Sequence, residues 1–429
     1  MGVFSSVCSG VLGQQGEACD GVSPDGSYEP GPLKYEVYMS DPQSLPPEKT
    51  APQACAAAVP EIPEPNPSSP SGRIISVDAL RGFDMFWIIG IDEVIWAAEK
   101  AWPNTFTHVL AAPLKHCEWD GFSFYDLIFP LFVFLVGVST VFSLTKTLQQ
   151  ENRAAPYKRI FRRFLLLYLA ALVHDGAFWG EHFRLLGVLQ RIAWCYLITA
   201  LLFCHLKFRG LLVVFFGILI SYWALLSFVP PPGEPSPTFA IGRTWPNYID
   251  LHYLPSGSGG RHGWINEGIL STVPAVATCL LGLFAGMLLR RKNVGDKQKV
   301  AGFVICGTLL VAVGYLWGLQ FPVIKRIWTS TYVLVAGGYS CVLLGLFYLI
   351  IDVYKRKKWA APFVRIGSNS ITAYVVCGAF PWWIGLDPLD GFLQPRLGDA
   401  AEVVNWSIIT VGVFLLICVL YRKKVFLRL

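Results

Sequence analysis

Long apolar stretches alternate with short polar connections through most of the chain, from residue 79 to residue 421. A helix needs about 20 consecutive, mostly apolar residues to cross the hydrocarbon core of a bilayer. We therefore predict an all-α, polytopic membrane protein with about ten transmembrane helices. The predicted spans are residues 79–97, 124–144, 164–178, 187–206, 211–230, 270–289, 300–319, 331–351, 364–383 and 404–421.

Residues 1–72 have a different composition from the rest of the chain. They are rich in Pro, Gly, Ser and acidic residues, and they show no apolar period. Such a segment cannot bury enough apolar surface to fold, so we expect a disordered tail followed by one transmembrane domain at 73–429. The tail also lacks the basic start and apolar core of a secretory signal.

Basic residues are distributed unevenly among the connections, and this predicts the orientation. One set of connections and the C-terminus hold 21 Lys and Arg, whereas the other set holds 8. Loops rich in Lys and Arg stay on the cytoplasmic side. Both termini are therefore predicted to be cytoplasmic. The loops expected to face the periplasm or a lumen are 98–123, 231–269, 320–330 and 384–403.

Composition agrees with a membrane protein, since 54% of the residues are hydrophobic and 15% are charged. The net charge of +6 does not indicate a nucleic-acid partner, because the basic residues form short clusters between apolar runs. The partner that this pattern indicates is the lipid bilayer. Spacings of Cys and His typical of zinc sites are absent from the sequence, so we predict no metal.

Ionisable side chains inside predicted spans are candidates for function, because burying a charge in lipid is costly. The first span holds Asp78 and Arg81, three residues apart on one helical face. They are predicted either to form a structural ion pair or to place Arg81 at a ligand. Asp92, near the outer end of this span, either reaches water or lines a substrate pocket.

The densest polar cluster of the chain lies just before the second span and contains His116, Asp120 and Asp126. Histidine exchanges a proton near neutral pH, and a neighbouring carboxylate can orient its ring. The alternative is a solvated loop histidine. Cys117 is a weaker candidate nucleophile, because adjacent residues of a chain rarely point at one another.

Further candidate residues lie at the ends of later spans. Gln190 and Arg191 open the fourth span, where the arginine needs an anionic ligand or a structural partner such as Asp84, Asp92 or Asp126. Glu267 precedes the sixth span together with two hydroxyl side chains. Asn369 follows a glycine at the start of the ninth span. P-loop, G-x-S-x-G and H-E-x-x-H motifs are absent from the sequence, which removes support for an ATPase, a serine hydrolase or a zinc protease.

Several motifs, in the same order, resemble the heparan-α-glucosaminide N-acetyltransferase family. They include Asp78-Ala79-Leu80-Arg81-Gly82-Phe83, His116-x-x-Trp119-x-Gly121, Asp126-x-x-Phe129-Pro130, Leu186 to Ala193 with its Gln190-Arg191 pair, Glu267-Gly268, Phe321-Pro322-x-x-Lys325-x-x-Trp328-Thr329 and Gly367-x-Asn369. The similarity covers nearly all of residues 73–425.

The resemblance implies an enzyme that takes an acetyl group from cytosolic acetyl-CoA and delivers it to an extracytoplasmic amino sugar or glycan. The catalytic histidine of the family corresponds to His116, which the predicted topology places on the outer side. Asp126 or Asp120 would orient it. Arg81, Asp92, Gln190, Arg191, Glu267, Lys325 and Asn369 are the expected substrate-binding residues. The resemblance also suggests a homodimer.

The sequence departs from the family pattern around the histidine. Asp92 and Asp120 stand where the pattern has Asn, and extra acid there could change the acceptor. An O-acyltransferase acting on a glycan hydroxyl and a sugar or anion transporter remain alternatives. The membrane would be a bacterial inner membrane or, in a eukaryote, an endomembrane.

Overall fold

The computed structural model describes five stretches of the chain, and all five belong to one compact unit, Cys55–Leu429. The described residues are 74–149, 154–174, 185–254, 267–384 and 387–426. The tail predicted at 1–72 lies outside them and stays a prediction. The described part of the chain consists of helices and connections, with one isolated β-bridge and no β-strand, as the hydrophobic pattern predicts.

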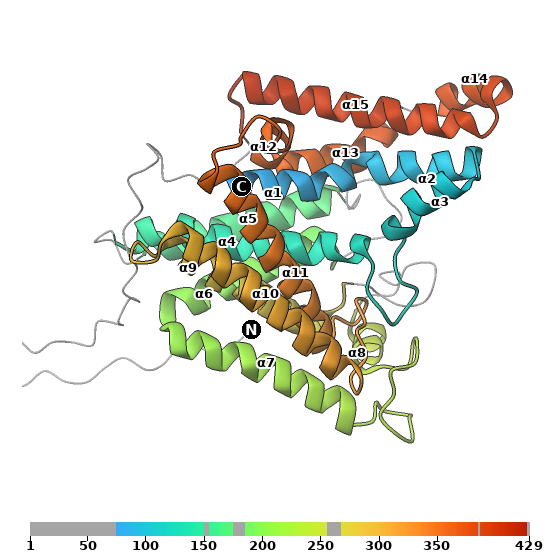
Figure 1. The fold of residues 1–429 in the computed structure, drawn as a ribbon. Helices are drawn as coiled ribbons and strands as arrows, with labels where there is room; N and C mark the ends of the chain where they lie inside the picture. Colours follow the sequence, from blue (N-terminus) through green and yellow to red (C-terminus); the bar gives the residue numbers. More distant parts are fainter. Residues whose placement is uncertain (1–73, 150–153, 175–184, 255–266, 385–386, 427–429) are drawn as a thin grey trace, which may run out of the picture. The chain divides into compact units, whose positions relative to one another are not determined.

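Helices of different lengths build the fold, and Figure 1 shows their arrangement. The long helices are α4 (Ile128–Leu148), α5 (Ala155–His174), α6 (Val188–His205), α7 (Phe208–Phe228), α9 (Ile269–Arg290), α10 (Asp296–Gly318), α11 (Ser330–Tyr348) and α15 (Ala400–Arg422). The shorter elements are α1 (Ile75–Phe86), η1 (Trp87–Ile91), α2 (Asp92–Ala101), α3 (Thr105–Ala111), η2 (Ala112–Leu114), η3 (Phe124–Leu127), α8 (Trp245–Tyr253), η4 (Leu349–Val353), α12 (Ala361–Ser368), α13 (Ser370–Ile384) and α14 (Asp387–Leu397).

Seven of the described helices are long and apolar enough to cross a membrane. They coincide with seven of the predicted spans, which shows a multi-pass membrane protein. The other three predictions, at 79–97, 164–178 and 364–383, fall on α1–α2, α5 and α12–α13, although 175–178 lie outside the described residues. These helical segments are shorter or more charged. The total of about ten spans and the orientation therefore stay predictions.

The first predicted span is a broken helix. The π-helical turn η1 separates α1 from α2, and Gly90 within it has a φ of 115°. A side chain at Gly90 would meet the Thr410 hydroxyl of α15 at 2.5 Å, so this position needs glycine for both its conformation and its space. Figure 1 shows α15 running beside α2 and α13. The break starts a new helix at Asp92.

Glycines let pairs of helices approach closely. A Cβ atom on Gly137 of α4 would lie 1.9 Å from the Cys279 carbonyl oxygen of α9, and one on Gly282 would lie 1.8 Å from the Phe134 carbonyl oxygen. Gly82 of α1 and Gly367 of α12 approach each other in the same way. Helices in lipid associate through such close packing, since the hydrophobic effect does not distinguish lipid from protein.

We expect Gly137→Ala to destabilise the fold, because the added methyl would force α4 and α9 apart. Overpacking of this kind costs about 1–3 kcal/mol. The control is Gly217→Ala in α7, where nothing lies within 4 Å of the added atom. Thermal unfolding in detergent should show a lower Tm for the first variant alone. Equal Tm values would contradict the packing described for α4 and α9.

Candidate active site

Three side chains meet just before the start of α4. Two come from one loop and from η3, and the third comes from a distant part of the chain. The Nδ1 atom of His116 lies 2.8 Å from Oδ1 of Asp126, and the same oxygen accepts a hydrogen bond from the Lys325 ammonium at 3.1 Å. Asp126 is 1% exposed, whereas the His116 side chain is 48% exposed. A buried carboxylate thus holds a histidine that remains accessible to solvent.

The contacts at Nδ1 of His116 define which nitrogen is available for chemistry. Lys325 Nζ also lies 3.1 Å from Nδ1. A single ring nitrogen cannot donate to Asp126 and accept from Lys325 at once. We assign the proton to Nδ1, because the shorter contact is to a carboxylate that needs donors in its buried position. The lone pair of the neutral ring is then on Nε2.

Asp126 also organises the loop that carries His116. Its second carboxylate oxygen accepts hydrogen bonds from the backbone N–H of Cys117 at 3.2 Å and from the N–H and hydroxyl of Ser123 at 3.1 and 3.0 Å. Tyr332 of α11 donates to its backbone carbonyl at 2.8 Å. One residue therefore fixes the histidine, its loop and the start of the second span.

Asp120 has a different partner from the one predicted. Its carboxylate accepts a hydrogen bond from the backbone N–H of Val323 at 3.0 Å, and an isolated β-bridge joins Asp120 to Ile324. Gly121, with a φ of 126°, makes the turn beside this contact and donates to the Val323 carbonyl oxygen. Of the two candidate carboxylates, Asp126 contacts the ring. Asp120 instead ties the histidine loop to the loop that carries Lys325.

Burial affects the charge of Lys325, the third member of the cluster. The surrounding protein lowers the pKa of this ammonium group, and the charge of Asp126 opposes that shift. The ammonium and the carboxylate each stabilise the ionised form of the other. Burial also raises the pKa of the neighbouring Cys117 thiol, which makes it a poor nucleophile at neutral pH.

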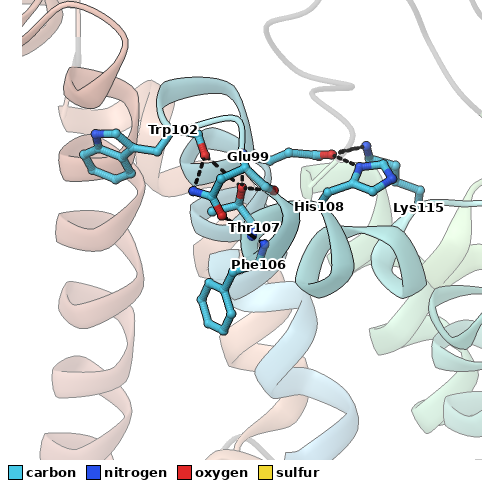
Figure 2. Close-up of polar contacts among 7 residues, drawn as sticks. Glu99, Trp102, Phe106, Thr107, His108 and Lys115 are labelled. Atoms are coloured by element: carbon cyan, nitrogen blue, oxygen red, sulfur yellow. Dashed lines mark hydrogen bonds and ion pairs between the residues drawn. The ribbon is translucent and has the colours of Figure 1, made fainter.

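A second set of contacts holds the residue directly before His116. Glu99, near the end of α2, accepts hydrogen bonds from the Lys115 ammonium at 2.8 Å and from Nδ1 of His108 at 3.0 Å (Figure 2). Asn104 caps α3 by accepting from the N–H groups of Phe106 and Thr107. The capped helix and the Glu99–Lys115 pair together anchor the start of the histidine loop.

Asp92 lies behind the histidine ring. The Tyr125 hydroxyl donates a short hydrogen bond to Asp92, and the Tyr125 ring packs against the His116 ring at 4.8 Å between centroids. Asp92 is 5% exposed. The prediction left two positions for this carboxylate, water or a pocket. The structure places it inside the protein, one side chain away from His116.

Arg191 is buried beside the same site. It donates a short hydrogen bond to Ser271 of α9, and its guanidinium lies over the Trp328 ring at 4.9 Å from the centroid. Glu267 and Asp250 act on it electrostatically, and the sequence suggested neither of these as its partner.

Asp250 of α8 is a residue that the sequence analysis missed. Its carboxylate accepts from the N–H of Ile269 at 2.9 Å and so caps α9. A Cβ atom on Gly268 would collide with that carboxylate at 1.6 Å. Burial raises the pKa of Asp250 to about 6, against the opposing effects of the Ile269 N–H and Arg191. The sequence contains no local signal for this contact, because Asp250 and Ile269 are 19 residues apart.

A cavity of about 290 Å³, which we call the histidine cavity, opens at His116. Asp126, Lys325, Glu267 and Arg191 line its polar part. Its apolar lining includes side chains of α1, α4, α6 and α13. Four of the predicted site residues therefore share one cavity with the histidine.

A larger cavity of about 540 Å³, the arginine cavity, is lined by Arg81, Arg159 and Arg163. Arg81 pairs with Asp78 at 3.3 Å, as predicted for the structural alternative, and also donates to the Ser139 hydroxyl at 2.5 Å. In the sequence, Arg159 and Arg163 belong to the basic connection between the second and third predicted spans. The structure shows that both line a cavity.

Four predicted site residues line neither cavity. Asp92 and Asp120 make the contacts described above, and the other two are Gln190 and Asn369. Gln190 is buried in α6. Asn369 lies between α12 and α13, where its amide donates to the Val425 carbonyl oxygen at 3.2 Å. In the described structure these two residues thus contribute to packing around the cavities rather than to their walls.

The fold and the site together define a multi-pass helical membrane protein in which a buried aspartate holds an accessible histidine and a lysine. A family model described as heparan-alpha-glucosaminide N-acetyltransferase, catalytic, matches residues 73–316. The chain therefore belongs to the heparan-alpha-glucosaminide N-acetyltransferase family. His116, Asp126 and Glu267 lie within the matched range, and Lys325 and Asn369 lie beyond it.

Two curated relatives carry the name heparan-alpha-glucosaminide N-acetyltransferase. The human protein is 26% identical over 83% of this chain, and the mouse protein is 26% identical over 86% of it. The chain spans 60% and 62% of the length of these relatives.

We expect Glu99→Gln to loosen the histidine loop, since the Lys115 tether loses its anion. Lys115 and His108 lower the pKa of Glu99 below its ordinary value of 4.5. The tether is therefore complete above pH 4.5 and is lost only as the pH falls through the lowered pKa. Hydrogen exchange of residues 105–118 should be faster in the variant at pH 7 and at pH 5.

The matched control is Glu234→Gln, which breaks an exposed ion pair with Arg243 in another loop. It should leave hydrogen exchange of residues 105–118 unchanged. Equal exchange of that segment in the wild-type protein and in Glu99→Gln would show that the tether does not order the loop.

Proposed function

We propose that this protein transfers an acetyl group from cytosolic acetyl-CoA to the amine of an extracytoplasmic amino sugar or glycan. The observation that carries the proposal is the pair of cavities. The accessible histidine lies in one, three arginines lie in the other, and the same four helices line both. Membership of the acetyltransferase family supports the same reaction.

The arginine cavity fits the phosphate groups of CoA. Guanidinium groups bind phosphate oxygens through paired hydrogen bonds, and Ser143 and Ser368 add hydroxyl donors to the same wall. The cavity lies at the end of α4 and the start of α5, next to the basic loop that the sequence places in the cytoplasm. The donor would therefore enter from the cytoplasmic side.

The length of α4 matches the reach of the donor. From Ser139, which binds Arg81, to Ile128 in the histidine cavity, α4 rises about 16 Å at 1.5 Å per residue. The extended pantetheine arm of CoA spans about 15–20 Å on the same bond geometry. A donor whose phosphates bind the arginines can thus bring its thioester to His116.

His116 would act as the general base. Its Nε2 accepts a proton from the acceptor amine as the amine nitrogen attacks the thioester carbonyl, the C–S bond breaks and the CoA thiolate leaves. Asp126 stabilises the imidazolium that forms, because it already binds Nδ1–H. Lys325 positions Asp126. A nucleophilic His116 would instead become acetylated when the enzyme is incubated with acetyl-CoA alone, and we expect no such label.

The polar rim of the histidine cavity suits an amino sugar. Glu267 offers a carboxylate to the ammonium form of the acceptor, and Trp119 offers an apolar face to a sugar ring. An acceptor panel that contains an amino sugar and its N-acetylated form tests this assignment. Transfer to the amino sugar alone supports N-acetylation, whereas transfer to both would indicate a hydroxyl acceptor.

We expect His116→Ala to lower kcat by about 10²–10⁴-fold, the usual contribution of a positioned base. Asp126→Asn should lower it by about 10²-fold or more, since the ring loses its anionic partner. The control His252→Ala removes an exposed histidine of α8 that contacts the carbonyl oxygen and the ring of Tyr248, outside both cavities. Acetyl transfer to glucosamine by the purified protein, with labelled acetyl-CoA, measures all three.

Retained transfer in His116→Ala would remove the histidine from the mechanism. Absence of transfer in the wild-type protein, together with uptake of the sugar into vesicles, would contradict the enzyme itself and indicate a transporter.

We expect Arg81→Ala to raise the KM for acetyl-CoA by about tenfold or more, as the loss of a charged hydrogen bond to phosphate predicts, with a smaller effect on kcat. Arg81→Lys should recover part of this loss. Arg243→Ala, which removes an exposed arginine outside both cavities, should leave the KM unchanged. An unchanged KM in Arg81→Ala would place the phosphates elsewhere.

A further inference from the structure

Four apolar side chains lie between the two cavities. Phe132 of α4, Leu189 and Ile192 of α6, and Ile371 of α13 line both the histidine cavity and the arginine cavity. Leu189 and Ile192 are each 3% exposed, and Phe132 is 8% exposed. We call these four side chains the septum. The two cavities therefore meet back to back across a thin layer of packed hydrocarbon.

One face of α4 continues from one cavity to the other. Phe129 and Phe132 line the histidine cavity, and Phe132, Val136, Ser139 and Ser143 line the arginine cavity. These positions are spaced by three and four residues, which places them in one stripe along the helix.

Helix α1 repeats this arrangement. Its residues Val77 and Arg81 line the arginine cavity, and Met85, followed by Ile88 of η1, lines the histidine cavity. Val77, Arg81 and Met85 are spaced by four residues, which places them on one face of α1. Helices α1 and α4 thus pass along both cavities, and the septum side chains line both of them.

Each cavity reaches the surface of the protein. His116 is 48% exposed at one end, and Arg159, at the other end, is also exposed. A permanently open path between such cavities would let protons cross the membrane. Packed apolar side chains exclude water, because a water there would find no polar partner.

We propose that the septum is a seal that closes the path between the cavities and opens only around the pantetheine arm of an acyl-CoA. The identity of the arm as part of an acyl-CoA rests on the proposed function. The seal is inferred from the two cavities alone. The cysteamine end of the arm is a narrow chain of methylene and amide groups. It fits between side chains of α4, α6 and α13 and restores the barrier while it occupies the gap.

Proton leakage through reconstituted protein tests the seal. The full chain is placed in phosphatidylcholine vesicles that contain a pH-sensitive dye, and a pH step is applied outside. Wild-type protein should hold the gradient as well as empty vesicles. Leu189→Ala and Ile192→Ala should each increase the proton flux at least tenfold, and CoA supplied on both sides should reduce this flux because its arm fills the gap.

The matched control is Leu197→Ala, which shortens another buried leucine of α6 that lines neither cavity. It should leave the vesicles tight. Equal flux in the septum variants and the control would overturn the proposal. A leak that CoA does not reduce would also overturn it, since the arm would then not occupy the septum.

A bulkier variant tests the passage without relying on a leak. Ile192→Trp should fill the septum, so that CoA still shifts the Tm of the protein while acetyl transfer falls at least 100-fold. Wild-type transfer rates in Ile192→Trp would contradict the proposal. Failure of the proposed function gives a different result, because the wild-type protein itself would then transfer no acetyl group.

Discussion

The site depends on one buried carboxylate. Asp126 contacts the histidine ring, the lysine ammonium and two backbone N–H groups, and it lies where the loop enters α4. Burying this charge is tolerable only because so many donors surround it. Most of these donors lie within ten residues of Asp126, but Lys325 is 199 residues away. The electrostatic requirement of one side chain therefore joins the loop of His116 to the loop of Lys325.

Close helix packing supplies the frame in which this carboxylate works. The glycines of α4 and α9 bring the two backbones together, and one stripe along α4 lines both cavities. Apolar side chains close the space between the cavities, and polar side chains are confined to the two ends. The proposed chemistry at one end and the proposed phosphate binding at the other thus share the helices that line both cavities, and Asp126 lies at the start of α4.

The sequence predicts those features that local pattern controls. Apolar runs indicate the helical class and the seven helices long enough to span, and the spacing of His116 and Asp126 brings them into one candidate cluster. Contacts between distant segments are not encoded locally. The sequence could not separate Asp120 from Asp126 as the partner of the ring, because a single backbone N–H of Val323 decides it. The cap that Asp250 provides for α9 and the cavity position of Arg159 are hidden for the same reason.

Transfer across a membrane is the central claim, and vesicles with the acceptor enclosed test it most directly. The full chain is reconstituted with glucosamine inside and labelled acetyl-CoA outside, and the label is measured in the sugar that the vesicles retain. The account predicts acetylated sugar inside the vesicles while CoA appears outside, without entry of acetyl-CoA. Product that forms only when donor and acceptor share one compartment would contradict it.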